Sequence, residues 1–194
     1  MHLGAKEGSA SGAPSHSTSI HPMTEPRLES EASCGPHAFS WRFAVREDVP
    51  LILDFIGRLA EYEKLAHEVV ATEALLEEWL FEKKKAEVVF ALEAGRPVGF
   101  ALFFHNFSTF LGRAGIYLED LFVLPEARGR GYGKALLKTL AGIALERGYG
   151  RLEWCCLDWN KPSIDFYLSM GATPMSGWTT YRVAGDGLEK LARC

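Results

Sequence analysis

Apolar residues recur with two different periods along most of this chain, and each period predicts one type of element. From Val49 to Leu65 and from Thr72 to Glu82 they return every three or four residues, which is the spacing of an amphipathic helix. Two apolar runs, Val88–Leu92 and Val98–Phe104, flank a turn that contains glycine and proline, so they predict a β-hairpin. The alternating residues Trp41–Val45 predict a strand ahead of all of these elements.

Strands and helices alternate toward the C-terminus. The predicted strand Gly115–Leu124 is followed by a helix over Gly133–Gly148, and the predicted strand Arg151–Leu157 by a helix over Pro162–Met170. A last strand is predicted at Trp178–Val183. This alternation predicts an α/β fold in which a mixed central β-sheet is flanked by helices on both faces.

Residues 1–38 differ in composition from the rest of the chain. Serine, glycine, alanine, proline and histidine dominate, and the isolated apolar residues show no period. Such a segment cannot bury enough apolar surface to offset the entropy lost on ordering. We therefore expect a disordered N-terminal tail over residues 1–38 and one globular domain over residues 39–194. The sequence leaves open whether the native chain starts at Met1 or at Met23.

Composition narrows the classes of function. The formal net charge of −4 disfavours a nucleic-acid binder that works by neutralising phosphates. No apolar run is long enough to cross a bilayer, so a membrane is not an expected partner. The four cysteines, Cys34, Cys155, Cys156 and Cys194, have the spacing of neither a metal site nor a disulfide framework. We expect a cytoplasmic protein with reduced cysteines and no bound metal.

A glycine-rich basic turn links the strand Gly115–Leu124 to the following helix. It reads R-G-R-G-Y-G-K over Arg128–Lys134, and backbone N–H groups at such a helix start can hold a phosphate. A Walker A loop would require glycine at Arg128 and serine or threonine at Ala135, and a Rossmann turn would require glycine at Lys134. The remaining pattern, R-x-x-G-x-G from Arg128, resembles the pyrophosphate loop of the GNAT superfamily of acyl-CoA N-acyltransferases.

Three further motifs narrow the resemblance. Together with the turn, they are similar to the spermidine/spermine (diamine) acetyltransferases and their thialysine-acetylating relatives, over Trp41 to about Leu191. The resemblance implies the GNAT fold, transfer of an acetyl group from the cosubstrate acetyl-CoA to a primary amine of a small cationic substrate, and a homodimer whose C-terminal strands meet. The four motifs are L-A-E-Y-E-K at Leu59–Lys64, Y-L-E-D at Tyr117–Asp120, R-G-R-G-Y-G at Arg128–Gly133 and D-W-N-K-P-S-I-D-F-Y at Asp158–Tyr167.

The resemblance also implies the residues of the site. Tyr62 and Glu63 match the substrate motif, in which the carboxylate receives a distal ammonium, and Glu119 faces the reacting amine. Asn160 is expected against the cofactor, although its place before a proline also suits a helix N-cap. The residues expected to bind acetyl-CoA are Leu121, Phe122, Val123, Arg128, Gly129, Arg130, Gly131, Tyr132, Gly133, Lys134, Asn160 and Ser163.

The chemistry of amine acetylation assigns two catalytic roles. A primary amine has a pKa near 10.4, so keeping it neutral at pH 7 costs about 4 to 5 kcal/mol and favours a positioned base. Glu119 is the candidate base, directly or through one water, and Tyr167 is placed by motif to protonate the leaving thiolate. Each has a structural alternative: Glu119 could pair with an arginine, and Tyr167 could be a core residue. In a regular strand Asp120 would face away from Glu119, so we expect it to be structural unless a bulge intervenes.

Other functions stay open at this stage. The segment Glu61–Glu82 is rich in glutamate and could attract a polyamine, but it could equally be a solvated helix face. The enzyme could act on an aminoglycoside, an amino acid or a protein amine. The chain could also be a non-catalytic acyl-CoA-binding module, although the presence of both Glu119 and Tyr167 disfavours that interpretation.

Overall fold

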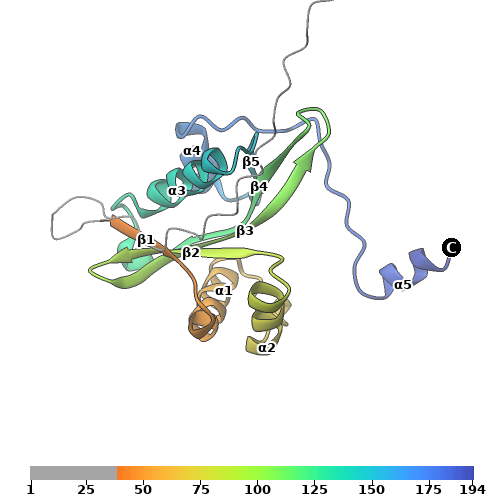
Figure 1. The fold of residues 1–194 in the computed structure, drawn as a ribbon, viewed down its shortest axis with the longest axis horizontal. Coiled ribbons are helices and arrows are strands. Elements are labelled where there is room, and N and C mark those ends of the chain that lie inside the picture. The colour runs from red at the N-terminus through yellow and green to blue at the C-terminus, as the bar shows by residue number, and fades with distance from the viewer. Residues whose placement is uncertain (1–38) are drawn as a thin grey trace, which may run out of the picture.

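A computed structural model describes residues 39–194, which form a five-stranded sheet with helices on both faces (Figure 1). The strands lie in chain order, so each is hydrogen-bonded to its neighbours in the sequence. The first three pairings are antiparallel, and only β4 and β5 run parallel. The predicted α/β fold with a mixed sheet is therefore confirmed. The strands are β1 (Phe39–Phe43), β2 (Glu87–Glu93), β3 (Arg96–Ser108), β4 (Arg113–Val123) and β5 (Leu152–Trp154).

The helices divide between the two faces of the sheet. Helix α1 (Val49–Glu63) and helix α2 (Glu73–Leu76) cover one face, and α3 (Tyr132–Glu146) and α4 (Lys161–Ser169) lie over the other (Figure 1). Each face has its own apolar cluster. Phe55 of α1 packs among Phe90, Phe100 and Phe122, while the α3 side buries Leu136 and Leu140 against residues of β3 and β4. The remaining helical elements are η1 (Arg46–Asp48), η2 (Ala66–Glu68), the π-helical turn η3 (Glu77–Glu82), η4 (Pro125–Ala127) and α5 (Asp186–Ala192).

Strand β4 contains a β-bulge at Glu119. Leu102 of β3 lies opposite Asp120, whereas the next residue, Phe103, lies opposite Leu118, so Glu119 is an additional residue in β4. A bulge breaks the alternation of side chains between the two faces of a sheet. It therefore removes the reason to assign Glu119 and Asp120 to opposite faces.

The prediction of a last strand at Trp178–Val183 is wrong for the single chain. Within residues 39–194 these residues pair with no strand, and Trp178 and Tyr181 are 73% and 91% exposed. The chain leaves α4 and runs away from the sheet to α5 (Figure 1). An aromatic, β-branched run has the propensity for a strand, but a strand also requires a neighbouring edge with which to exchange hydrogen bonds. Strand β5 is also shorter than predicted, ending at Trp154 rather than at Leu157.

The predicted disordered tail, residues 1–38, lies outside the described residues. Within residues 39–194, no helix combines the length and the apolar character required to span a bilayer.

Candidate active site

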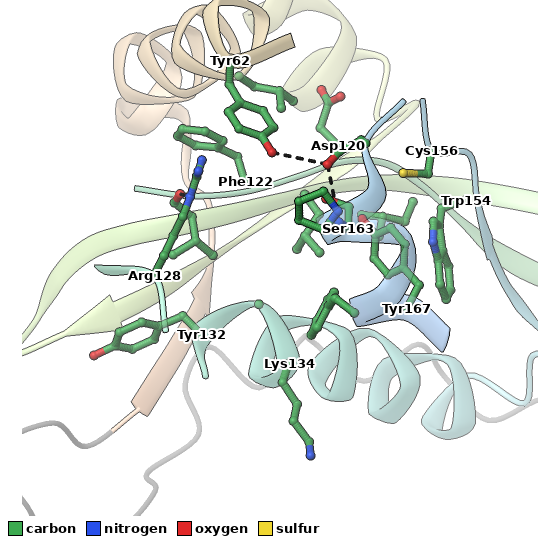
Figure 2. A pocket seen from close by; sticks show the side chains of 18 of the residues that line it. Tyr62, Asp120, Phe122, Arg128, Tyr132, Lys134, Trp154, Cys156, Ser163 and Tyr167 are labelled. Atoms are coloured by element: carbon green, nitrogen blue, oxygen red, sulfur yellow. Dashed lines mark hydrogen bonds between the residues drawn. The ribbon is translucent and has the colours of Figure 1, made fainter. Parts of the chain in front are cut away.

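A cleft of about 840 Å³ opens where the sheet divides. Strand β5 pairs with β4 at only three positions, Ile116–Leu118, after which the two chains separate. The cleft lies between the end of β4, the end of α1, the start of α3 and the segment from β5 to α4 (Figure 2). Every residue that the sequence placed in the site lines this cleft except Arg130.

The glycine-rich turn forms one end of the cleft. Gly129 and Gly131 have φ values of 76° and 88°, in the left-handed region that favours glycine. Gly131 is the N-cap of α3 and has no side chain to satisfy the free N–H groups of the first helical turn. Space is open around the position of a Cβ at Gly131. This geometry suits an anion bound by backbone N–H groups.

The two arginines of the turn point to different surroundings. Arg128 lies in the cleft wall, where its Nε donates to the carbonyl oxygen of Val123 at 3.0 Å and its guanidinium lies over the rings of Tyr62 and Phe122 at 4.6 and 5.4 Å. Arg130 lies outside the cleft and is paired with Glu93. The Arg130 side chain therefore does not line the cleft in which the sequence places the cofactor.

Three carboxyl groups, those of Glu63, Glu119 and Asp120, lie together in the cleft. Burial, with the nearby charges of Glu119 and Glu63, raises the pKa of Asp120 to about 6. Burial also raises the pKa of Glu63. Among residues 39–194, no lysine or arginine forms an ion pair with the Glu119 side chain. This part of the cleft is therefore suited to a cationic ligand.

Tyr167, on α4, faces the same cleft (Figure 2). Its ring packs against those of Trp154 and Phe166, with centroids 5.1 and 5.4 Å apart. Burial raises the pKa of Tyr167 to about 12, so the phenol keeps its proton at neutral pH. The structure thus combines the two alternatives that the sequence offered for Tyr167. Its ring packs on the core, and its protonated hydroxyl lies at the cleft.

Asn160 connects the two sides of the cleft. Its buried side-chain oxygen accepts a hydrogen bond from the Ser163 backbone N–H at 3.4 Å, which makes it the N-cap of α4. The same oxygen accepts from the hydroxyl of Tyr62 at 3.3 Å (Figure 2). Since Tyr62 is on α1, this bond ties α1 to α4 across the cleft.

Sequence reasoning missed three titratable residues that line the cleft. Asp120 is brought there beside the bulge, and Cys155 and Cys156 are there because β5 ends at Trp154, so strand alternation no longer separates them. The hydroxyl of Tyr117 donates to Sγ of Cys155 at 3.0 Å, and burial raises the pKa of the Cys156 thiol. Within the part of the chain that the structure describes, no group of three or more His, Cys, Asp or Glu side chains is placed to hold a metal ion.

The fold, the glycine-rich turn and the matched residues define the class of protein. Residues 55–172 match the model of the acetyltransferase (GNAT) family, so the chain belongs to this family and is an acetyltransferase. It is 38% identical to the thialysine N-epsilon-acetyltransferase of Bos taurus, over 78% of this chain and 95% of that protein. It is 34% identical to the L-ornithine N5-acetyltransferase of Arabidopsis thaliana, over 86% of this chain and 94% of that protein.

A solved structure of an integron cassette protein from the mobile metagenome of V. cholerae has the same fold. The TM-score is 0.68 and the identity 31%, over 80% of this chain and 98% of that one.

Proposed function

We propose that this enzyme transfers the acetyl group of acetyl-CoA to a primary amine of a small cationic substrate, by direct attack in a ternary complex. The observation that carries the proposal is one cleft with a glycine-capped helix start at one end and three carboxyl groups beside Tyr167 at the other. The first end suits the pyrophosphate of the cofactor, with its pantetheine beside Leu121–Val123. The second end suits an amine that must lose a proton and a thiolate that must gain one.

In the proposed mechanism Glu119 acts as the base, directly or through one water. It is an exposed carboxylate with no cationic partner among residues 39–194, so it is available to take a proton from the incoming ammonium. The neutral amine attacks the thioester carbonyl and forms the C–N bond; the tetrahedral intermediate then breaks its C–S bond to expel the thiolate of CoA, and the second proton lost by the nitrogen restores the Tyr167 phenol after its donation. Tyr167, whose pKa of about 12 keeps it protonated, donates to that thiolate. Neither role requires a metal or a covalent enzyme intermediate.

For the substrate, we propose an amine with a second positive charge several bonds from the reacting nitrogen. Polyamines, thialysine and other lysine-like amines, including ornithine, all fit this description. Glu63 is the proposed partner of the distal charge, beside Tyr62 in the cleft wall. Aminoglycosides, amino acids of other types and protein amines remain the alternative acceptors, and a non-catalytic acyl-CoA-binding module is the alternative of a different class.

A turnover assay with acetyl-CoA tests the proposal against a panel of polyamines, thialysine, lysine, ornithine, an aminoglycoside and a peptide N-terminus. CoA binding without turnover of any acceptor would favour the non-catalytic module. Within the panel, Glu63→Gln should raise KM for a diamine far more than KM for a monoamine of equal length, because removing one partner of a charged hydrogen bond costs a few kcal/mol. Equal effects on the two amines would exclude Glu63 as the receptor of the distal charge.

We also propose that the enzyme is a cytoplasmic homodimer. The apolar side chains of Met175, Trp178 and Tyr181 are 60%, 73% and 91% exposed, and the last two belong to the segment for which the sequence predicts a strand. Pairing with a second copy would give this segment the hydrogen-bonded neighbour that the single chain does not supply.

A further inference from the structure

One carboxylate oxygen joins the two residues on either side of Gly131. Oε1 of Glu93, the last residue of β2, accepts from Nη1 of Arg130 at 2.7 Å and from the hydroxyl of Tyr132 at 2.9 Å. The Glu93 side chain is only 17% exposed, so both bonds are partly shielded from water. Hydrogen bonds to a charged acceptor in such surroundings are stronger than those between neutral groups.

These hydrogen bonds stabilise a part of the chain that has no stabilising side-chain contact at Gly131 itself. Gly131 has no side chain, lies at φ 88° and begins α3 without a side-chain cap. Arg130 is further tied to the turn by Nη2, which donates to the carbonyl oxygen of Glu126 at 3.0 Å. Tyr132 is the first residue of α3, and its ring is buried in the core. Glu93 therefore connects the turn to the helix start across Gly131, which lies between them.

The arrangement also assigns Arg130 a role other than contact with phosphate. Its guanidinium is engaged by the Glu93 side chain and the Glu126 carbonyl outside the cleft, whereas the residues at the start of α3, Gly131–Lys134, line the cleft. Figure 2 shows Tyr132 with its hydroxyl directed away from Tyr167 and the carboxyl end of the cleft. An anion bound at the start of α3 would contact the backbone of the turn. The Arg130 side chain would stabilise that backbone from the side opposite the cleft.

Strand β2 contacts α3 in the same way at its other end, where no cofactor is expected. Glu87, the first residue of β2, accepts from Nη1 and Nη2 of Arg147 at 2.6 and 2.8 Å, just beyond the C-terminal end of α3. Each end of β2 thus has a glutamate that ties down one end of the same helix, and only Glu93 does so at the cleft. Glu87 is therefore a matched control for removal of a helix-anchoring ion pair.

We propose that Glu93 is a positioning residue for the cofactor, which sets the conformation of the turn Arg128–Tyr132 through Arg130 and Tyr132. The inference rests on the proposed function, because it takes the turn to be the pyrophosphate site of acetyl-CoA. Glu93 does not line the cleft, so we expect it to contact neither substrate nor cofactor. Its removal therefore weakens binding of acetyl-CoA while leaving the chemical step of the bound complex intact.

Calorimetry with CoA and steady-state kinetics on full-length protein test this inference. Glu93→Met should raise the Kd for CoA and the KM for acetyl-CoA about tenfold, with kcat and the KM for the amine within about twofold of wild type. Glu93→Gln keeps an acceptor oxygen without the charge, so its Kd for CoA should lie between those of wild type and Glu93→Met. Glu87→Met should lower the thermal midpoint at least as much as Glu93→Met and leave the Kd unchanged.

A double variant isolates the route through Arg130. Adding Arg130→Met to Glu93→Met should weaken CoA binding by clearly less than the sum of the two single effects, because both variants remove the same contact between Arg130 and Glu93. Additive effects, an unchanged Kd in Glu93→Met, or tighter CoA binding by a released Arg130 would each overturn the inference. Wild-type protein that binds no CoA would instead refute the proposed function, so the two failures are distinguishable.

Discussion

At the scale of single residues, the hydroxyl of Tyr167 can be removed by mutation without loss of the packing of its ring. Tyr167→Phe keeps the ring that packs on Trp154 and Phe166 and removes only the oxygen. Folding and the Kd for CoA should therefore persist, while kcat falls by about 10² to 10⁴-fold, the usual contribution of general acid–base catalysis. Single-turnover kinetics is the measurement, since slow product release would hide part of the effect. An unchanged chemical rate would exclude Tyr167 as the acid.

Asp120 should make the stability of the protein depend on pH. Its pKa is about 6 in the folded protein against an ordinary value of 3.8, so folding disfavours the charged form. Well below pH 3.8 the carboxyl is neutral in both states; as pH rises through 3.8 to about 6 the unfolded state binds fewer protons, and wild type loses stability. We therefore expect Asp120→Asn to become more stable relative to wild type as pH rises. The difference in free energy of unfolding, variant minus wild type, should be larger at pH 8 than at pH 4 by up to about 3 kcal/mol.

Urea unfolding of both proteins at the two pH values measures that difference. Asp158→Asn, which replaces an exposed aspartate, is the control for the exchange of side-chain type. A difference in free energy of unfolding between wild type and Asp120→Asn that stays constant from pH 4 to 8 would contradict the raised pKa of Asp120. The same experiment bears on function, because a carboxyl that titrates near neutrality beside Glu119 changes the charge offered to an amine.

At the scale of elements, the turn between β4 and α3 depends on backbone conformation rather than on side chains. Gly131→Val would place a branched side chain in open space at φ 88° and alter the N–H groups of the helix start. We expect CoA affinity to fall at least about tenfold, because the substitution disrupts both the conformation and the close approach of the phosphate. Calorimetry with CoA is the measurement.

Gly148 offers a matched control for this substitution. It follows the other end of α3, also has a positive φ, of 69°, and also has open space around the position of a Cβ. Gly148→Val should therefore reduce stability to a similar extent without a change in the Kd for CoA. If a folded Gly131→Val protein binds CoA as well as Gly148→Val does, the turn is not the cofactor site.

At the scale of the whole molecule, the exposed segment Trp178–Val183 predicts self-association. Light scattering should give twice the mass of the chain over a wide concentration range. Tyr181→Asp, in the middle of the segment, should shift the protein toward the monomer. Leu145→Asp is the control, because it adds the same charge at a residue of α3 that is 78% exposed. A wild-type protein that is monomeric at all concentrations would refute the dimer.

The sequence by itself determined the parts of this protein that depend on neighbours along the chain. The glycines and arginines of Arg128–Gly133 act as one local unit, so their spacing predicted the turn before α3. Asn160 caps the helix that follows it, as its place before a proline indicated. The spacing of apolar residues likewise predicted the two hairpin strands and α1, because an element that buries one face shows it in the order of its own residues.

Only the tertiary structure decided the features that depend on a partner distant in sequence. The bulge at Glu119 exists as a mismatch between β4 and β3, and it brings Asp120 into the cleft. Trp178–Val183 has strand-forming residues but pairs with no strand of residues 39–194, so propensity alone predicted the wrong state. Glu93 meets Arg130 and Tyr132 across 37 and 39 positions of sequence. Such pairings follow from the packing of β2 beneath the start of α3, which no local pattern of residues encodes.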